Sequence, residues 1–180
     1  MRKEIDKSHF VYNFNESKHP ILEVFGPTVQ FLMTPEEAAQ PLCVLKGIIP
    51  PGSSVPLHSH DDVECFYMIS GYQEVLIEAR GELIWIGCNP GDFIQVPGGT
   101  KHAFRNRSSA PGISICCMTA KLGRFFEEVG RPLFPGLLTS TPTPEALQKF
   151  VQIAMRYGYW LATPEENAAA GVPVFQASLS

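Results

Sequence analysis

Turn-forming residues divide this 180-residue chain into short segments, because it contains 16 prolines and 15 glycines. The segments between them are rich in β-branched and aromatic residues and have the length of β-strands. This rhythm predicts an all-β sandwich or barrel. The expected strands cover residues 41–49, 54–60, 64–70, 73–79, 82–86, 93–96, 102–106 and 112–119.

The two ends of the chain carry signals for helices. Thr34 and Thr163 each precede Pro-Glu-Glu, in which the threonine can cap a helix, the proline fits the first turn and the second glutamate can close a capping box. Thr143 can cap a third helix with apolar residues at helical spacing, and a shorter amphipathic segment covers 123–129. We therefore expect one domain over residues 1–180, with an N-terminal arm over 1–39, a barrel core over about 40–120 and a C-terminal helical extension over 121–180.

Charge and hydropathy argue against two classes of partner. The formal net charge is −4, and acidic and basic residues are interspersed, so no basic stripe is present to follow a phosphate backbone. The N-terminus runs into polar sequence, and no apolar segment has the length of a membrane span. We expect no nucleic-acid or membrane partner and a cytoplasmic location. The five cysteines include no CxxC pair and are expected to be reduced thiols.

Three of the five histidines fall in two short segments whose spacing suits one metal ion. His58 and His60 are separated by one residue in an expected strand, so both point to one face. Glu64 opens the next strand, and a turn over residues 97–99 can bring His102 across from the first pair. Coordination to a cation removes the cost of burying the carboxylate among apolar neighbours. These four residues predict one divalent transition metal, with Fe, Mn, Ni, Co, Cu and Zn all compatible.

Two motifs around these residues resemble those of the cupin superfamily. The first cupin motif is similar to Gly52-x5-His58-x-His60-x3-Glu64-x6-Gly71, and the second to Gly91-x5-Pro97-x-Gly99-x2-His102-x3-Asn106. The resemblance implies a double-stranded β-helix, the jelly-roll barrel of the cupins, with the metal inside it. It also implies that His58, His60, Glu64 and His102 are the metal ligands.

The residues that share a strand face with these ligands predict an apolar cavity. Phe66 and Met68 have the parity of Glu64, and Phe104 has the parity of His102; Phe93 is expected to join them as a substrate contact. Such a lining suits a small hydrophobic organic substrate. A sugar phosphate fits poorly, because few lysines or arginines are expected to point inward.

The C-terminal region resembles that of bacterial quercetin 2,3-dioxygenase-like single cupins, over Arg124-Phe125-Phe126-Glu127-Glu128-Val129-Gly130 and the segment from Thr143 to Tyr157. This resemblance implies a metal-dependent dioxygenase that uses dioxygen to cleave a flavonol, enol or diketone. Glu64 would then be both a metal ligand and the catalytic base that removes the substrate hydroxyl proton.

Two other functions remain open. One is a metal-assisted lyase or isomerase, in which the ion polarises a carbonyl and no oxygen is consumed. The other is a non-catalytic cupin that binds a small molecule. We also expect a homodimer, partly from the resemblance and partly because pairing covers exposed strand edges.

Overall fold

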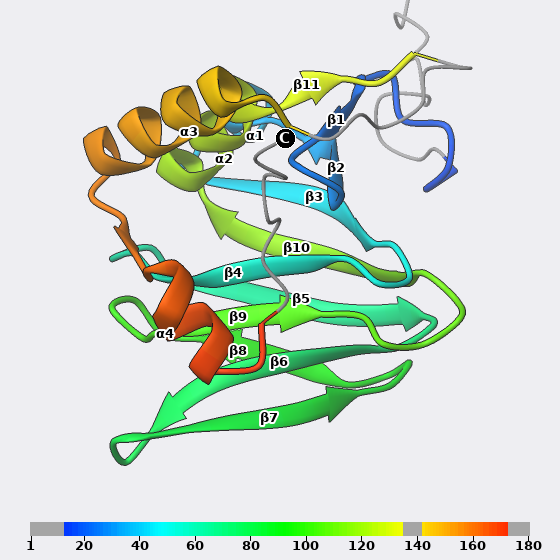
Figure 1. Cartoon of the computed structure of the whole chain (residues 1–180). Helices are drawn as coiled ribbons and strands as arrows, with labels where there is room; N and C mark the ends of the chain where they lie inside the picture. The colour runs from blue at the N-terminus through cyan, green and yellow to red at the C-terminus, as the bar shows by residue number, and fades with distance from the viewer. Residues whose placement is uncertain (1–12, 135–141, 173–180) are drawn as a thin grey trace, which may run out of the picture.

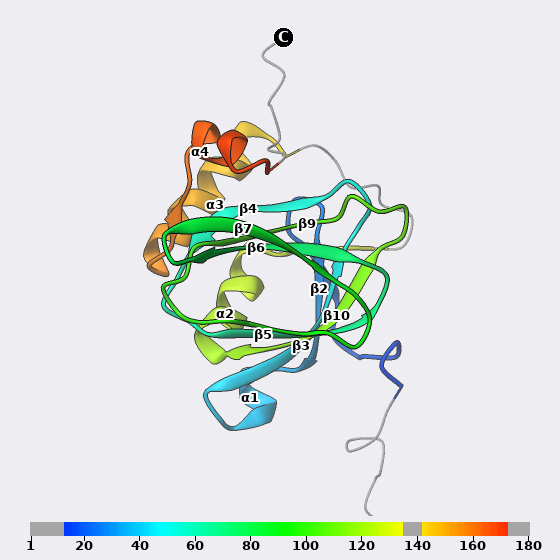
Figure 2. The same ribbon diagram turned by 90° about the horizontal axis from the view of Figure 1, so that it is seen from below.

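The computed structural model describes residues 13–134 and 142–172 and consists mainly of two antiparallel β-sheets (Figure 1). The first sheet has seven strands in the order β11-β1-β2-β3-β10-β5-β8, and the second has five in the order β12-β4-β9-β6-β7. Seen from below, the two sheets face each other across the barrel interior (Figure 2). This architecture confirms the predicted all-β jelly-roll barrel.

The strands of the larger sheet are β1 (Ile21–Glu23), β2 (Thr28–Met33), β3 (Leu42–Ile49), β5 (Glu64–Ser70), β8 (Phe93–Val96), β10 (Gly112–Thr119) and β11 (Arg131–Pro132). Those of the smaller sheet are β4 (Ser54–Ser59), β6 (Gln73–Ala79), β7 (Glu82–Cys88), β9 (His102–Arg105) and β12 (Trp160–Leu161). Every strand expected from the sequence is present, and each boundary agrees to within two residues. Turn residues set these boundaries, which explains the agreement.

Within the described residues, four helices accompany the sheets: α1 (Pro35–Ala38), α2 (Ala120–Val129), α3 (Pro144–Arg156) and α4 (Pro164–Ala169). Thr34 and Thr163 form the expected capping boxes, and Thr143 caps α3. Helix α2 begins three residues before the expected segment, because Thr119 accepts a hydrogen bond from the Leu122 amide and so caps it at Ala120. None of the helices in the described ranges has the length and apolar character needed to cross a lipid bilayer.

Four strands were not expected from the sequence. β1 and β2 lie in the segment assigned to the N-terminal arm, yet β2 pairs with β3 and extends the larger sheet. β11 and β12 contain two residues each and pair with β1 and β4. Such short strands are defined by their partners, so local sequence carries little signal for them. Residues 1–12, 135–141 and 173–180 of the expected arm and extension lie outside the described residues.

In the part of the chain that the structure describes, three groups of buried apolar residues hold the layers together. The barrel interior contains Ile49, Met68, Val75, Cys88, Ile94, Val96 and Phe104. A second group joins the larger sheet to α2 and α3, and a third joins the outer face of the smaller sheet to the C-terminal segment. In the second group Leu45 and Cys43 are fully buried, as is Ala103 in the third. Helices α2 and α3 thus lie against the larger sheet (Figure 1), and β12 pairs with β4, the strand that carries His58.

Candidate metal centre

Strand pairing brings the two histidine-bearing segments together. His58 on β4 is the direct register partner of His102 on β9, and His60 follows immediately after β4. The turn before β9 reinforces this approach, because the Gly99 amide donates to the His60 carbonyl at 2.7 Å. Gly98 permits it, since an added Cβ would lie 2.2 Å from the Asp61 carbonyl oxygen. The role expected for the turn at 97–99 is thus confirmed.

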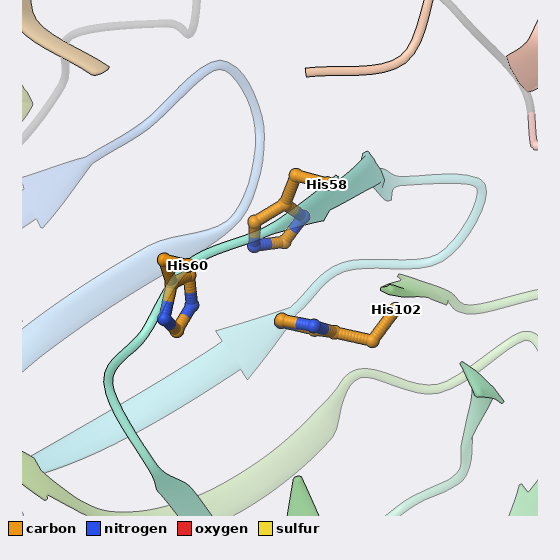
Figure 3. Close-up of side chains that lie close together, drawn as sticks. All are labelled: His58, His60 and His102. Carbon is orange, nitrogen blue, oxygen red and sulfur yellow. The ribbon is translucent and has the colours of Figure 1, made fainter. Parts of the chain in front are cut away.

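The three imidazoles form a compact, buried cluster. One ligand nitrogen from each of His58, His60 and His102 lies within 4.8 Å of the other two. The ring centroids of His58 and His102 are 4.2 Å apart, and those of His60 and His102 are 5.2 Å apart. Figure 3 shows His58 and His60 from one segment and His102 from the neighbouring strand β9, all around a common space. This spacing suits a single ion.

The hydrogen bonds of the rings leave nitrogen lone pairs available at the centre of the cluster. Nδ1 of His58 lies 2.7 Å from the Pro56 carbonyl, and Nδ1 of His102 lies 2.8 Å from the Thr100 carbonyl. A carbonyl can only accept, so each Nδ1 carries the proton and each Nε2 carries the lone pair. Nε2 of His102 and both nitrogens of His60 are buried and have no hydrogen-bond partner in the described part of the chain. Buried polar atoms are normally paired, so this cluster fits a metal ion.

Glu64, the first residue of β5, supplies the carboxylate expected beside these rings. Its side chain is only 5% exposed, and its Oε1 lies 3.1 Å from Nε2 of His60. Its Oε2 lies 3.7 Å from Nε2 of His102. The structure therefore brings together all four residues predicted as ligands. Three imidazoles and one carboxylate form a nitrogen and oxygen donor set of the kind that first-row divalent metals accept.

Burial favours the neutral form of two of the rings. It lowers the pKa of His58 well below the ordinary value, and the nearby His102 and His60 rings act in the same direction. It also lowers the pKa of His102, although the Glu64 carboxylate opposes that change. Metal ligation requires the neutral imidazole. These two rings are therefore ready to bind a metal ion at neutral pH.

Tyr159, which the sequence analysis did not single out, completes the surroundings of the cluster. Its ring is stacked on His58 at a centroid distance of 5.8 Å and lies 4.7 Å from His60. On its other side it stacks on Phe125 of α2 at 4.5 Å. Burial raises the pKa of Tyr159 well above the ordinary value, so the phenol is neutral. No local spacing links Tyr159 to the histidines; its position depends on the pairing of β12 with β4.

A cavity of about 360 Å³ opens beside the cluster, and His58, Glu64 and Tyr159 contribute to its wall. Most of the lining is apolar, with residues from both sheets, the β1–β2 hairpin and helices α2 and α3. Phe66 and Phe104, expected as substrate contacts, are part of the wall, with ring centroids 4.9 Å apart. The volume lies at the lower end of the range for small-molecule sites.

The two other expected substrate contacts are placed differently. The expectation that Phe93 contacts the substrate is wrong. Its side chain is 64% exposed, because Ile94 and Val96 are the residues of β8 that face inward. A shift of one position moves a side chain to the opposite face of a strand. Met68 does point inward and is 1% exposed, but it packs in the barrel core and is not among the described residues that line the cavity.

Comparison with known proteins agrees with this fold. Residues 46–117 match the Cupin domain family, which covers the strands that carry all four candidate ligands. No curated protein matches the sequence significantly. The family match is confined to this barrel segment, which is less than half of the chain.

Solved structures are similar in fold at low sequence identity. Oxalate decarboxylase from Lactobacillus farciminis is 21% identical, with a TM-score of 0.51 over 60% of this chain and 32% of that one. The cupin domain of Cnp3 from Schizosaccharomyces pombe is 14% identical, with a TM-score of 0.50 over 61% of this chain and 68% of that one. These likenesses establish the barrel and leave the reaction to be argued from the site.

Proposed function

We propose that this protein is a metal-dependent dioxygenase that acts on a small hydrophobic enol, flavonol or diketone. The observation that carries the proposal is that two members of the cluster, His58 and Glu64, form part of the wall of a largely apolar cavity, with His60 and His102 directly beside them. The bound ion would be one divalent transition metal, held by His58, His60, Glu64 and His102. Dioxygen would be the second substrate.

Residues of the chain itself would accept the substrate proton and bind the substrate. A bound divalent metal would lower the pKa of a substrate hydroxyl and supply the open positions that oxygen chemistry needs. The Glu64 carboxylate would accept the hydroxyl proton, since a general base must lie within hydrogen-bond reach of it. Phe66 and Phe104 would hold the flat substrate and exclude water from its reacting carbons.

The cavity lining supports an apolar substrate over a charged one. Its acidic or basic members among the described residues are Glu64 and the His58 imidazole, both at the candidate metal centre. A sugar phosphate would lose its hydration in such a cavity without gaining a cationic partner. An aromatic enol loses little on entry, because most of its surface is apolar.

Oxygen consumption tests the proposal. Purified protein, reconstituted separately with Fe(II), Mn(II), Ni(II) and Co(II), is offered flavonols and β-diketones in an oxygen electrode. Uptake that depends on one metal and one substrate class is the expected result, and Glu64→Gln should reduce it strongly. Metal bound at one ion per chain without any uptake would contradict the dioxygenase and favour a lyase or isomerase.

A further inference from the structure

One buried polar group in the cavity is not explained by the metal centre. Gln73, the first residue of β6, is 1% exposed and forms part of the cavity wall. Its side-chain oxygen Oε1 has no hydrogen-bond partner in the described part of the chain. An unpaired amide oxygen in an apolar interior destabilises a fold, so its presence needs a reason. A ligand that donates a hydrogen bond to it supplies one.

The side chain of Gln73 is held in position by its neighbours. Residues 73, 75 and 77 of β6 face inward, while Glu74 faces outward and binds Arg105 and Arg107. Gly112 on β10 makes room for the amide, because an added Cβ there would lie 3.3 Å from Gln73 Oε1. A glutamine packed in this way presents its amide to a ligand without a large loss of side-chain entropy.

Gln73 lines the cavity at a different level of the barrel from the histidines. His102 pairs with Ile77, and Gln73 precedes Ile77 by four residues on the same strand. At the rise of an extended strand this separation is about 13 Å. Phe104, which pairs with Val75, lies between the two levels and lines the same cavity. The cavity wall thus carries polar groups at both levels, with the aromatic ring of Phe104 between them.

We propose that Gln73 is a specificity-determining residue that accepts a hydrogen bond from a hydroxyl at the far end of an elongated, flat substrate. This inference rests on the proposed function, because it takes the enol group of the substrate to lie at the candidate metal centre. It narrows the substrate class to aromatic enols that carry a second, distal hydroxyl. A hydroxylated substrate satisfies the amide oxygen, whereas an analogue without that hydroxyl leaves it buried and unpaired.

Ligand binding tests the proposal without turnover. Protein loaded with Zn(II), which has no redox chemistry, is titrated with 3-hydroxyflavone and with its 4′-hydroxy derivative. Gln73→Leu should weaken binding of the 4′-hydroxy compound roughly tenfold and change the Kd of 3-hydroxyflavone less than twofold. Gln95→Leu, the same substitution at an exposed position of β8, is the matched control and should change neither Kd.

Thermal stability gives a second readout that needs no ligand. Gln73→Leu removes an unpaired buried oxygen and adds apolar surface, so it should raise the Tm of the metal-free protein. A lower Tm would show that the amide serves the fold and would overturn the proposal. Equal effects of Gln73→Leu on the two flavones, or no binding of either by the wild-type protein, would also overturn it. Hydroxyl-dependent binding without oxygen uptake by any metal form would contradict the proposed dioxygenase alone.

Discussion

Two histidines of the candidate metal centre are oriented by the same local contact. Nδ1 of His58 and Nδ1 of His102 each donate to the carbonyl two residues earlier, at Pro56 and Thr100. Such a contact fixes both the tautomer and the ring direction without another side chain. The local backbone therefore orients these two candidate ligands, and the pairing of β4 with β9 places the two rings together.

Replacing His58 or His102 with alanine should abolish metal binding. Each change removes one of three nitrogen donors, and we expect metal content to fall from one ion per chain to near zero after dialysis. Elemental analysis by mass spectrometry measures this directly. His19→Ala is the control, because His19 lies outside the site and contacts Glu37. Full occupancy in the His58 and His102 variants would refute the site.

The ring of Tyr159 should matter more than its hydroxyl for metal affinity. Tyr159→Ala removes the surface that stacks on His58 and packs against His60, so both rings gain freedom that binding must then remove. We expect metal affinity to fall roughly tenfold, while Tyr159→Phe retains it. Competition with a chelator of known affinity gives both values. A similar loss in Tyr159→Phe would assign the effect to the hydroxyl.

Among the secondary-structure elements, β4 is held on both sides by distant parts of the chain. It pairs with β9 along one edge and with β12 along the other. Asn167 on α4 accepts a hydrogen bond from the Leu57 amide at 2.8 Å and donates to the carbonyls of Ala162 and Thr163. The C-terminal segment thus supports the strand that carries His58, which connects the helical extension to the candidate site.

On the edge away from β4, β9 pairs with β6. Glu74 of β6 adds a side-chain hydrogen bond to this pairing, because it accepts from Arg105 of β9. Hydrogen bonds donated by Arg107 and, to a smaller extent, by Arg105 lower the pKa of this carboxylate from 4.5 to about 2, although burial opposes the change. A lowered pKa means that the ionised form stabilises the fold above about pH 4.5, and that this stability is lost as pH falls toward 2.

Glu74→Gln should therefore destabilise the protein at neutral pH. We expect a loss of about 2 kcal/mol at pH 7, less than the full pKa change would give because Arg107 is exposed and its interaction is screened. The difference from wild type should shrink as pH falls toward 2. Urea unfolding at a series of pH values measures it, and a difference independent of pH would show that the ion pairs contribute nothing.

At the scale of the whole molecule, the homodimer remains a prediction, and the structure suggests where to test it. Tyr67 and Phe93 are register partners on the outer face of the larger sheet and are 47% and 64% exposed, with Ile69 nearby at 42%. Exposed apolar side chains grouped in this way favour association. Phe93→Arg should shift a dimer toward monomer in sedimentation velocity. A monomeric wild-type protein would refute the homodimer, and a dimeric variant would exclude this face.

Most of the barrel and all four candidate ligands could be predicted from sequence, because their signals are local. Turn residues mark the strands, alternation assigns the faces of His58 and His60, and threonine caps mark the helices. Phe93 was misassigned because the face of a four-residue strand depends on a parity that one residue can reverse. Strand β12 contains two residues and exists through its partner β4, so no local pattern predicts it.

The sequence by itself determined the chemistry available to this protein: three imidazoles and a carboxylate at a spacing that one barrel brings together. Only the tertiary structure decided what surrounds them. Tyr159 reaches the histidines because the C-terminal segment pairs with β4, and Gln73 enters the same cavity through the register of β6 with β9. The physical reason is that such contacts join residues far apart in the chain, and their geometry follows from the packing of whole elements.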